Sequence, residues 1–226
     1  MSKTVLWVLG VLVLVLVLGS GYWFFSRSNQ SSVEDGRMVP PAVPSDVTGA
    51  TTTTSTNTTT NANQKIMHAT FHTSMGDITV ELFPQKAPNT VANFIKLASS
   101  GFYSGTKFHR VIKGFMDQGG DPLTKDDTKA GLWGTGGPGY KFNDEIASEN
   151  GNVAGALAMA NSGPNTQGSQ FFINAVDNRG NLGNNYTVFG QVTSGMSVVA
   201  AINNTPTGPG DRPLTPVVLT SVTVSQ

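Results

Sequence analysis

A guanidinium, an amide and two large apolar side chains follow one another closely at 108–121. Arg110 precedes a Val-Ile pair, and Phe115, Met116 and Gln118 come next. The guanidinium and the amide donate hydrogen bonds, and phenylalanine beside methionine offers an adaptable apolar surface. On a strand, Met116 and Gln118 point to one face and Phe115 to the other, unless the backbone bulges at a neighbouring glycine. The stretch predicts hydrogen-bond donation beside an apolar surface.

A second stretch, at 157–173, offers a similar combination. Asn161 stands beside a Gly/Pro turn, and Gln170 alternates with Phe172. Each residue alone has a plainer interpretation, in which the phenylalanines belong to the core and the polar residues to the surface. Several amide and guanidinium donors together with Phe and Met on short strands favour a binding or catalytic site instead.

Other chemistries find little support in the sequence. His68 and His72 lack both a third ligand and the glutamate of a zinc-protease motif, so we expect no metal. The glycine-rich segment 134–139 matches GxGxxG, but it contains a proline and no helix follows, so we interpret it as a surface loop. His109 lies within an apolar strand and is expected to be a hydrogen-bonded structural residue. The absence of cysteine excludes disulfides and thiolate catalysis.

The elements that must position these residues lie in 66–226. Apolar and polar residues alternate on both sides of 74–77, which predicts an antiparallel hairpin. Helical spacing predicts a helix that Pro88 opens and Gly101 ends, and a second helix near 196–202. Short apolar runs between glycine clusters predict further strands and a closed antiparallel sheet, at 107–112, 114–118, 152–159, 171–174, 187–189 and 217–224.

Two long motifs then identify a resemblance. FHRVIKGFMDQGGD at 108–121 and MANSGPNTQGSQFFI at 159–173 resemble the cyclophilin family of peptidyl-prolyl cis-trans isomerases, and GTGGPGYKFNDE at 134–145 and TVFGQV at 187–192 agree in order and spacing. The resemblance covers essentially all of 66–226. It implies a mainly β fold, with a closed eight-stranded antiparallel β-barrel capped by two α-helices. It also implies an outer groove that binds an extended Xaa-Pro segment.

The resemblance also assigns roles to residues of this chain. Arg110 would be the catalytic hydrogen-bond donor, and no cofactor or metal is implied. The other residues would bind the substrate: Phe115, Met116, Phe172 and Leu182 as the proline pocket, Gln118, Ala160 and Asn161 as peptide contacts, Gln170 as a support of the groove, and Tyr186 where many relatives have histidine.

One position departs from the family pattern. Asn181 occupies the place of a tryptophan that many relatives carry before the VFG strand. Loss of the indole removes a large apolar wall and an N–H donor. We therefore predict weak binding of cyclosporin.

An uncharged apolar segment at 4–25 precedes the domain. Its 22 residues would span about 33 Å as a helix, which matches a hydrocarbon core of about 30 Å. We expect a retained single-pass transmembrane anchor, because Tyr22 and Trp23 continue the apolar run with aromatic residues. The alternative is a cleaved signal peptide that ends at the small residues 19–21.

Residues 26–65 form a Thr/Ser/Pro-rich segment with almost nothing to bury, which predicts a disordered linker. The sequence thus predicts three parts, at 1–25, 26–65 and 66–226. Such stalks are typical of exported, surface-tethered proteins, so we expect the domain outside the cytoplasm, or secreted if the signal is cleaved. The folded part holds ten basic and eleven acidic residues, which argues against nucleic acid as a partner.

These observations favour a monomeric, membrane-tethered isomerase that acts on Xaa-Pro segments of protein chains as they fold outside the cytoplasm. The main alternative is a non-catalytic module of the same fold that binds proline-containing segments or acts as a chaperone. A protein that only displays surface loops is a third class. Arg110 favours catalysis, because a pure binder does not need a charged donor.

Overall fold

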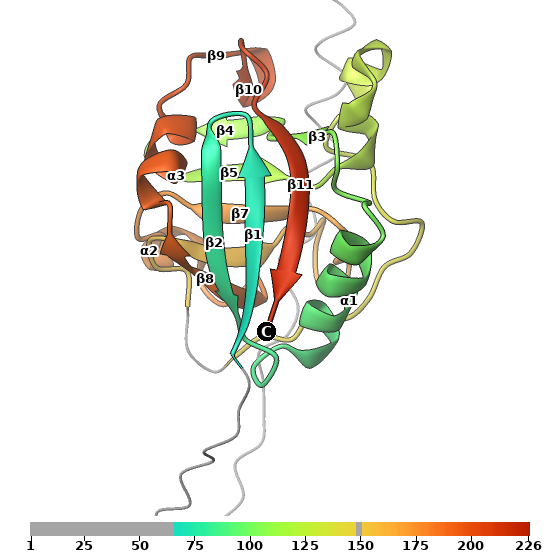
Figure 1. Cartoon of the computed structure of the whole chain (residues 1–226), viewed down its shortest axis with the longest axis vertical. Coiled ribbons are helices and arrows are strands. Elements are labelled where there is room, and N and C mark those ends of the chain that lie inside the picture. The colour runs from blue at the N-terminus through green and yellow to red at the C-terminus, as the bar shows by residue number, and fades with distance from the viewer. Residues whose placement is uncertain (1–65, 148–150) are drawn as a thin grey trace, which may run out of the picture. The chain divides into compact units, whose positions relative to one another are not determined.

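The computed structural model describes residues 66–147 and 151–226, which form the domain shown in Figure 1. The anchor predicted at 4–25 and the linker predicted at 26–65 lie outside these residues. Within the described ranges, no helix combines the length and the apolar character that crossing a membrane requires.

The domain is mainly β and is built around one strongly curled sheet (Figure 1). In the described residues this sheet has nine strands, all paired antiparallel, in the order β3-β11-β1-β2-β8-β6-β7-β5-β4. The strands are β1 (Met67–Thr73), β2 (Gly76–Leu82), β3 (Thr106–Lys107), β4 (Arg110–Ile112), β5 (Met116–Gly119), β6 (Ala156–Met159), β7 (Phe171–Asn174), β8 (Val188–Ser194) and β11 (Val218–Ser225). A separate hairpin pairs β9 (Thr207–Gly208) with β10 (Arg212–Pro213).

The structure confirms a mainly β fold with a strongly curled sheet, and in the described residues it corrects the expected number of strands from eight to nine. The sheet order has two ends, β3 and β4, which are consecutive pieces of one stretch of chain. This stretch pairs first with β11 and then with β5, and Phe108 and His109 make the change of partner. The Phe108 amide donates to the Val217 carbonyl, and the His109 amide donates to the Gln118 carbonyl, each at 3.0 Å. The bend divides one expected strand into two, which gives nine strands.

Helices flank the sheet on two sides (Figure 1). The two expected helices are present as α1 (Pro88–Ser99) and α3 (Met196–Asn203). A third helix, α2 (Arg179–Leu182), was not predicted, because its four residues show no apolar periodicity. Three 3₁₀ turns are also present, η1 (Pro122–Lys125), η2 (Asp127–Leu132) and η3 (Pro209–Asp211).

The strand period of two divides β7 between two apolar clusters. Phe171 lies in the main core, where its ring centroid is 5.2 Å from that of Phe71 and 5.7 Å from that of Tyr103. Its neighbour Phe172 points to the opposite face and belongs to a second, smaller cluster. Leu157 and Ala158 on β6 divide in the same way. The main core thus fixes the sheet, and the sheet presents the second cluster on its outer face.

Candidate active site

One row of side chains crosses four adjacent strands on the outer face of the sheet. Arg110 on β4 is opposite Gln118 on β5, Gln118 is opposite Phe172 on β7, and Phe172 is opposite Ala158 on β6. Residues directly opposite one another on antiparallel strands point to the same face. The register therefore places the predicted catalytic donor on the same face as the predicted apolar pocket.

The apolar end of this row is the second cluster. Met116, Ala158 and Phe172 form its buried centre, and their exposed fractions are at most 4%. Partly buried side chains surround this centre: Ile112, Phe115, Ala160, Leu182, Tyr186 and Val188. The structure thus brings together every residue predicted for the proline pocket, together with Ala160 and Tyr186.

Phe115 joins this cluster because it is not part of a strand. A turn closes where the Phe115 amide donates to the Ile112 carbonyl at 3.0 Å, and Gly114 within that turn has φ +71°. This left-handed conformation is accessible to glycine at little cost. Since β5 begins only at Met116, the alternation expected for a strand does not apply to Phe115. A turn, rather than a bulge, places Phe115 and Met116 together.

The polar end of the row is a relay of side-chain hydrogen bonds. Arg110 Nη1 donates to Gln118 Oε1 at 3.5 Å, and Gln118 Nε2 donates to Gln170 Oε1 at 3.0 Å. Gln170 Nε2 then donates to the carbonyls of Gly134 and Gly136, at 2.9 and 2.8 Å. Gln170 therefore links Gln118 to the glycine-rich loop, and the two carbonyls of that loop fix the orientation of its amide.

A cavity of about 500 Å³ opens beside this relay. Gln118, Ala160, Asn161 and Gln170 line it, and so does the glycine-rich stretch 134–141. The sequence interpretation made 134–139 a glycine-rich surface loop, and the structure confirms a loop without regular secondary structure there. It adds that this loop lines the cavity. Its glycines and carbonyls are common in any loop, and only the order and spacing shared with the family pointed to it.

Asn161 lines the cavity, but its side chain also holds the surrounding loops. Its Nδ2 donates to the Asn185 carbonyl at 2.9 Å, and its Oδ1 accepts from the Gly163 amide at 3.2 Å. The amide of Ala160 donates to the Gln170 carbonyl at 2.9 Å. These contacts tie the loops on this side of the cavity to one another.

The comparisons with known proteins agree with this geometry. The family model for cyclophilin-type peptidyl-prolyl cis-trans isomerases matches residues 68–224. A peptidyl-prolyl cis-trans isomerase of Arabidopsis thaliana is 48% identical over 159 residues, which cover 70% of this chain and 96% of the relative. Peptidyl-prolyl cis-trans isomerase B of Streptomyces anulatus is 47% identical over 177 residues, with 70% and 96% covered. This chain belongs to the cyclophilin family.

Solved cyclophilins also share the fold. A cyclophilin-type isomerase of Cryptosporidium parvum, crystallised in the presence of the dipeptide Ala-Pro, aligns with a TM-score of 0.64 and 33% identity. The alignment covers 70% of this chain and 99% of that protein. The present chain is thus a cyclophilin-type peptidyl-prolyl cis-trans isomerase whose family likeness lies in the described domain.

Two titratable groups of this cyclophilin are buried directly behind the groove. Burial raises the pKa of Asp117 to about 7, although a hydrogen bond from Asn203 Nδ2 at 2.8 Å opposes the shift. Burial also lowers the pKa of His109, and this effect outweighs the negative charge of nearby Asp121, which raises that pKa. Neither ring nitrogen of His109 has a hydrogen-bond partner among the described residues. The expectation that this histidine is hydrogen-bonded is therefore wrong. The ring is held by packing, and both groups favour the uncharged state.

Proposed function

We propose that Arg110 is the catalytic residue of this isomerase and that the second cluster holds the proline ring. Rotation about an Xaa-Pro bond faces a barrier of roughly 18–20 kcal/mol, because it breaks the resonance of the amide. A donor that hydrogen-bonds the imide nitrogen favours the single-bonded form of the transition state. An apolar pocket that grips the ring lets the preceding residue turn. Side chains of the chain itself are sufficient for this chemistry.

The row from Arg110 to Phe172 is the observation that supports this assignment. The Arg110 side chain is 45% exposed and its Nη2 has no hydrogen-bond partner among the described residues. Gln118 is opposite Arg110 in the sheet and accepts a hydrogen bond from Nη1. Since Gln118 is in turn opposite Phe172, this hydrogen bond holds the guanidinium on the side of the apolar cluster. A permanently charged donor is therefore available beside a preformed apolar pocket. Gln118, Ala160 and Asn161 would contact the peptide backbone along the groove.

Exchange NMR spectroscopy on a short Xaa-Pro peptide tests the role of Arg110. We expect Arg110→Ala to lower the catalysed exchange rate about a hundredfold, as loss of one transition-state donor does elsewhere. Arg110→Lys keeps the charge but loses the planar array of donors, and should recover little activity. Exchange that persists unchanged in Arg110→Ala would refute the assignment. Binding without exchange in the unmodified protein would instead support a non-catalytic proline-binding or chaperone module.

We further propose that this cyclophilin is a monomer anchored to the cell membrane through 4–25, with its catalytic domain outside the cytoplasm. The length and lack of charge of that segment, and the threonine-rich run at 51–60, support this location. Exported chains with Xaa-Pro bonds would be its substrates. Protease added to intact cells should remove the domain, while 4–25 should stay with the membrane fraction. Recovery of a protein that begins near residue 22 from the medium would favour secretion instead.

A further inference from the structure

A second side chain contacts the guanidinium of Arg110 from a distant part of the sequence. Asp211 Oδ2 accepts a hydrogen bond from Arg110 Nε at 3.4 Å, and the two residues are 101 positions apart. Asp211 ends η3, in the connection between β9 and β10. Both η3 and β10 pack against β4. The hairpin 207–213 therefore lies beside the predicted catalytic strand.

The backbone at Asp211 restricts which residues can stand there. Asp211 has φ +58°, in the left-handed region, and it follows Gly210 at φ +72°. Apart from glycine, aspartate and asparagine adopt this conformation most readily. A glycine would relieve the backbone but could not contact Arg110. The observed residue thus supplies a carboxylate at a position where few side chains are tolerated.

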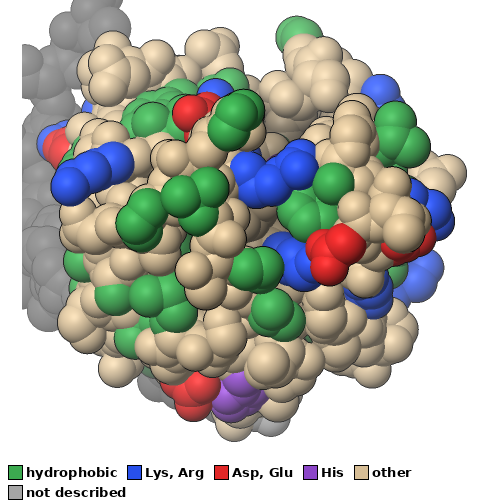
Figure 2. All heavy atoms as spheres, turned by 90° about the horizontal axis from the view of Figure 1, so that it is seen from above, with side chains coloured by type: hydrophobic (Ala, Val, Ile, Leu, Met, Phe, Trp, Pro, Cys, Tyr) green, Lys and Arg blue, Asp and Glu red, His purple; other side chains and the backbone are tan. Residues whose placement is uncertain are grey.

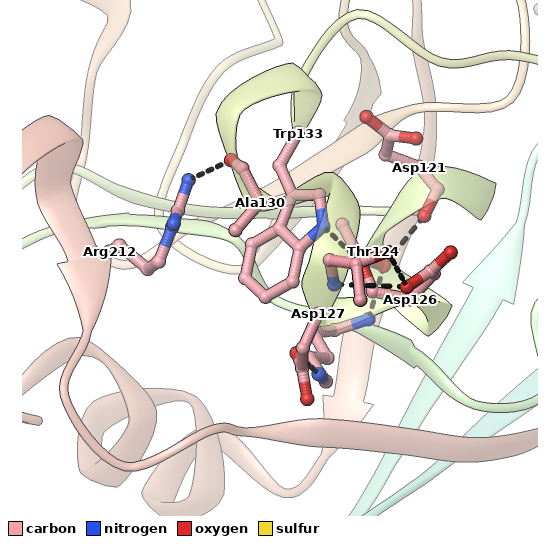
Figure 3. A network of polar contacts seen from close by, with 9 residues as sticks. Asp121, Thr124, Asp126, Asp127, Ala130, Trp133 and Arg212 are labelled. Atoms are coloured by element: carbon pink, nitrogen blue, oxygen red, sulfur yellow. Dashed lines mark hydrogen bonds and ion pairs between the residues drawn. The ribbon is translucent and has the colours of Figure 1, made fainter.

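The next residue anchors the hairpin. The Arg212 guanidinium lies over the Trp133 ring, 4.3 Å from its centroid, and Arg212 Nη2 donates to the Ala130 carbonyl (Figure 3). Lys107 Nζ lies 4.8 Å from the centroid of the same ring, and Trp133 Nε1 donates to the Asp126 carbonyl at 3.2 Å. Contacts of a cation with an aromatic face stabilise such clusters. Arg212 thereby holds the hairpin against the segment 121–136.

The segment 121–136 also supports the second contact to Arg110, which Gln118 makes with Nη1. Gly134 directly follows Trp133, and its carbonyl accepts from Gln170, which accepts from Gln118. Buried Asp121 fixes the same segment, because its Oδ2 accepts from the amides of Gly134 and Gly136. Figure 2 looks onto the end of the molecule that carries β9 and β10, and shows basic and acidic side chains next to one another beside a hollow. The segment 121–136 is thus connected to Arg110 in two ways. Gln170 and Gln118 connect it to Nη1, and Arg212 and Asp211 connect it to Nε.

We propose that Asp211 is a positioning residue of the isomerase, which holds the guanidinium plane of Arg110 by its Nε and leaves Nη2 directed to the substrate. The proposal rests on the catalytic role of Arg110 given above. Asp211 acts through Arg110 and touches no reacting atom. A guanidinium that is fixed before the substrate arrives loses less conformational entropy on reaching the transition state. Asp211 should therefore affect turnover more than peptide affinity.

Two substitutions test this proposal without disturbing the backbone. Asp211→Asn and Asp211→Gly both tolerate the left-handed conformation, so the fold should be retained. Asparagine can still accept from Nε, whereas glycine cannot. We expect the catalysed exchange rate to fall about two- to threefold in Asp211→Asn and about five- to tenfold in Asp211→Gly. The affinity for the peptide, measured by titration, should stay within about twofold.

The control and the double variant separate positioning from other effects. Asp77→Asn removes a comparable exposed carboxylate on β2, which contacts His72 on β1. Because β2 is far from β4 in the sheet order, this variant should leave the exchange rate unchanged. When Arg110 is already alanine, Asp211→Gly should cause no further loss. All variants are measured in the full-length chain in detergent.

Each result decides the proposal. An unchanged or increased rate in Asp211→Gly, with a normal loss in Arg110→Ala, overturns the positioning role and leaves Arg110 catalytic. A loss of affinity equal to the loss of rate also overturns it, since it would mark Asp211 as a substrate contact. An equal further loss in the Arg110→Ala background would show that Asp211 acts independently of Arg110. If Arg110→Ala itself has no effect, the proposed function fails first.

Discussion

The ring of Tyr186 meets the ring of Phe172 edge-on, with centroids 5.3 Å apart and planes at 90°. Phe172 is fixed in the sheet, and Tyr186 comes from the chain between α2 and β8. The sequence interpretation placed tyrosine where many relatives carry histidine. The edge-to-face contact shows that this tyrosine forms one wall of the apolar cluster.

Removal of this wall should weaken substrate binding. We expect Tyr186→Ala to lower the affinity for an Xaa-Pro peptide about fivefold, because the ring offers apolar surface to the proline and a loss of about 1 kcal/mol of binding free energy corresponds to that factor. Tyr186→Phe keeps the ring and serves as the matched control. A titration followed by NMR measures both variants. Equal loss in the two would show that the hydroxyl, and not the ring contact, matters.

The exposed Asn181 on α2 offers a gain-of-binding experiment. Asn181→Trp restores the large apolar wall and the N–H donor that many relatives have, so affinity for cyclosporin should rise by about tenfold or more. Isothermal titration of the unmodified chain and the variant measures the difference. Nanomolar affinity in the unmodified chain would contradict the prediction that its binding is weak.

Gln170 is the residue through which the glycine-rich loop orients the groove. Gln170→Glu keeps the size of the side chain but replaces the amide that donates to the Gly134 and Gly136 carbonyls with a carboxylate. The carboxylate cannot donate to these oxygens and attracts Arg110 away from the substrate. We expect the exchange rate to fall about tenfold or more, with Gln170→Asn as a milder variant. A rate within twofold of the unmodified protein would show that the relay is dispensable.

Asp117 should make the stability of the domain depend on pH. Its pKa is raised from 3.8 to about 7 in the folded state, so between these values the folded protein binds the proton and the unfolded chain does not. Stability from this group is therefore greatest at low pH and declines as pH rises towards 7. We expect Asp117→Asn to be about 2 kcal/mol more stable than the unmodified protein at pH 8, and similar at pH 4.5.

Chemical unfolding at several pH values measures this difference. The comparison with Asp117→Asn isolates one carboxyl group, because all the other titratable groups are common to both proteins. A difference in the free energy of unfolding that does not change with pH would mean that Asp117 is already ionised in the folded protein.

Glu145 supplies the N-terminal cap of α1 from far along the chain. Its carboxylate accepts from the backbone amides of Asn89 and Thr90, at 3.1 and 2.8 Å. Burial raises the pKa of Glu145, but these hydrogen bonds outweigh it and hold the pKa below its ordinary value. The stability from this contact is present above the ordinary pKa and is lost as pH falls through the lowered value.

We expect Glu145→Ala to lower the free energy of unfolding by about 1 kcal/mol at neutral pH, as loss of a helix cap does. The loss should shrink as pH falls through the lowered pKa of Glu145, because protonation removes the charge in the unmodified protein. Glu145→Gln retains an acceptor and should lie between the two. Thermal unfolding of the three proteins checks this order, and a loss independent of pH would point to packing instead.

Several features follow from the local sequence. The β1–β2 hairpin and α1 agree with their predicted ranges, because periods of two and 3.6 residues record which side chains face the core. The residue types of the groove were also evident, since Phe, Met, Gln and Arg gather in two short stretches. The prediction failed at Phe108 and His109, where the strand changes partner. Alternation alone does not say which neighbour a strand chooses.

The sequence by itself determined most of the elements and the kinds of side chain available to the site, since both depend on residues that are near one another in the chain. The tertiary structure alone decided which of them meet. Arg110 and Asp211 are 101 positions apart, and Glu145 caps a helix that begins 57 positions earlier. Such contacts depend on strand register and on the path of loops through space. In the sequence, each of these contacts is represented only by common residues that are far apart in the chain, with no motif that connects them. Neither contact could therefore be predicted.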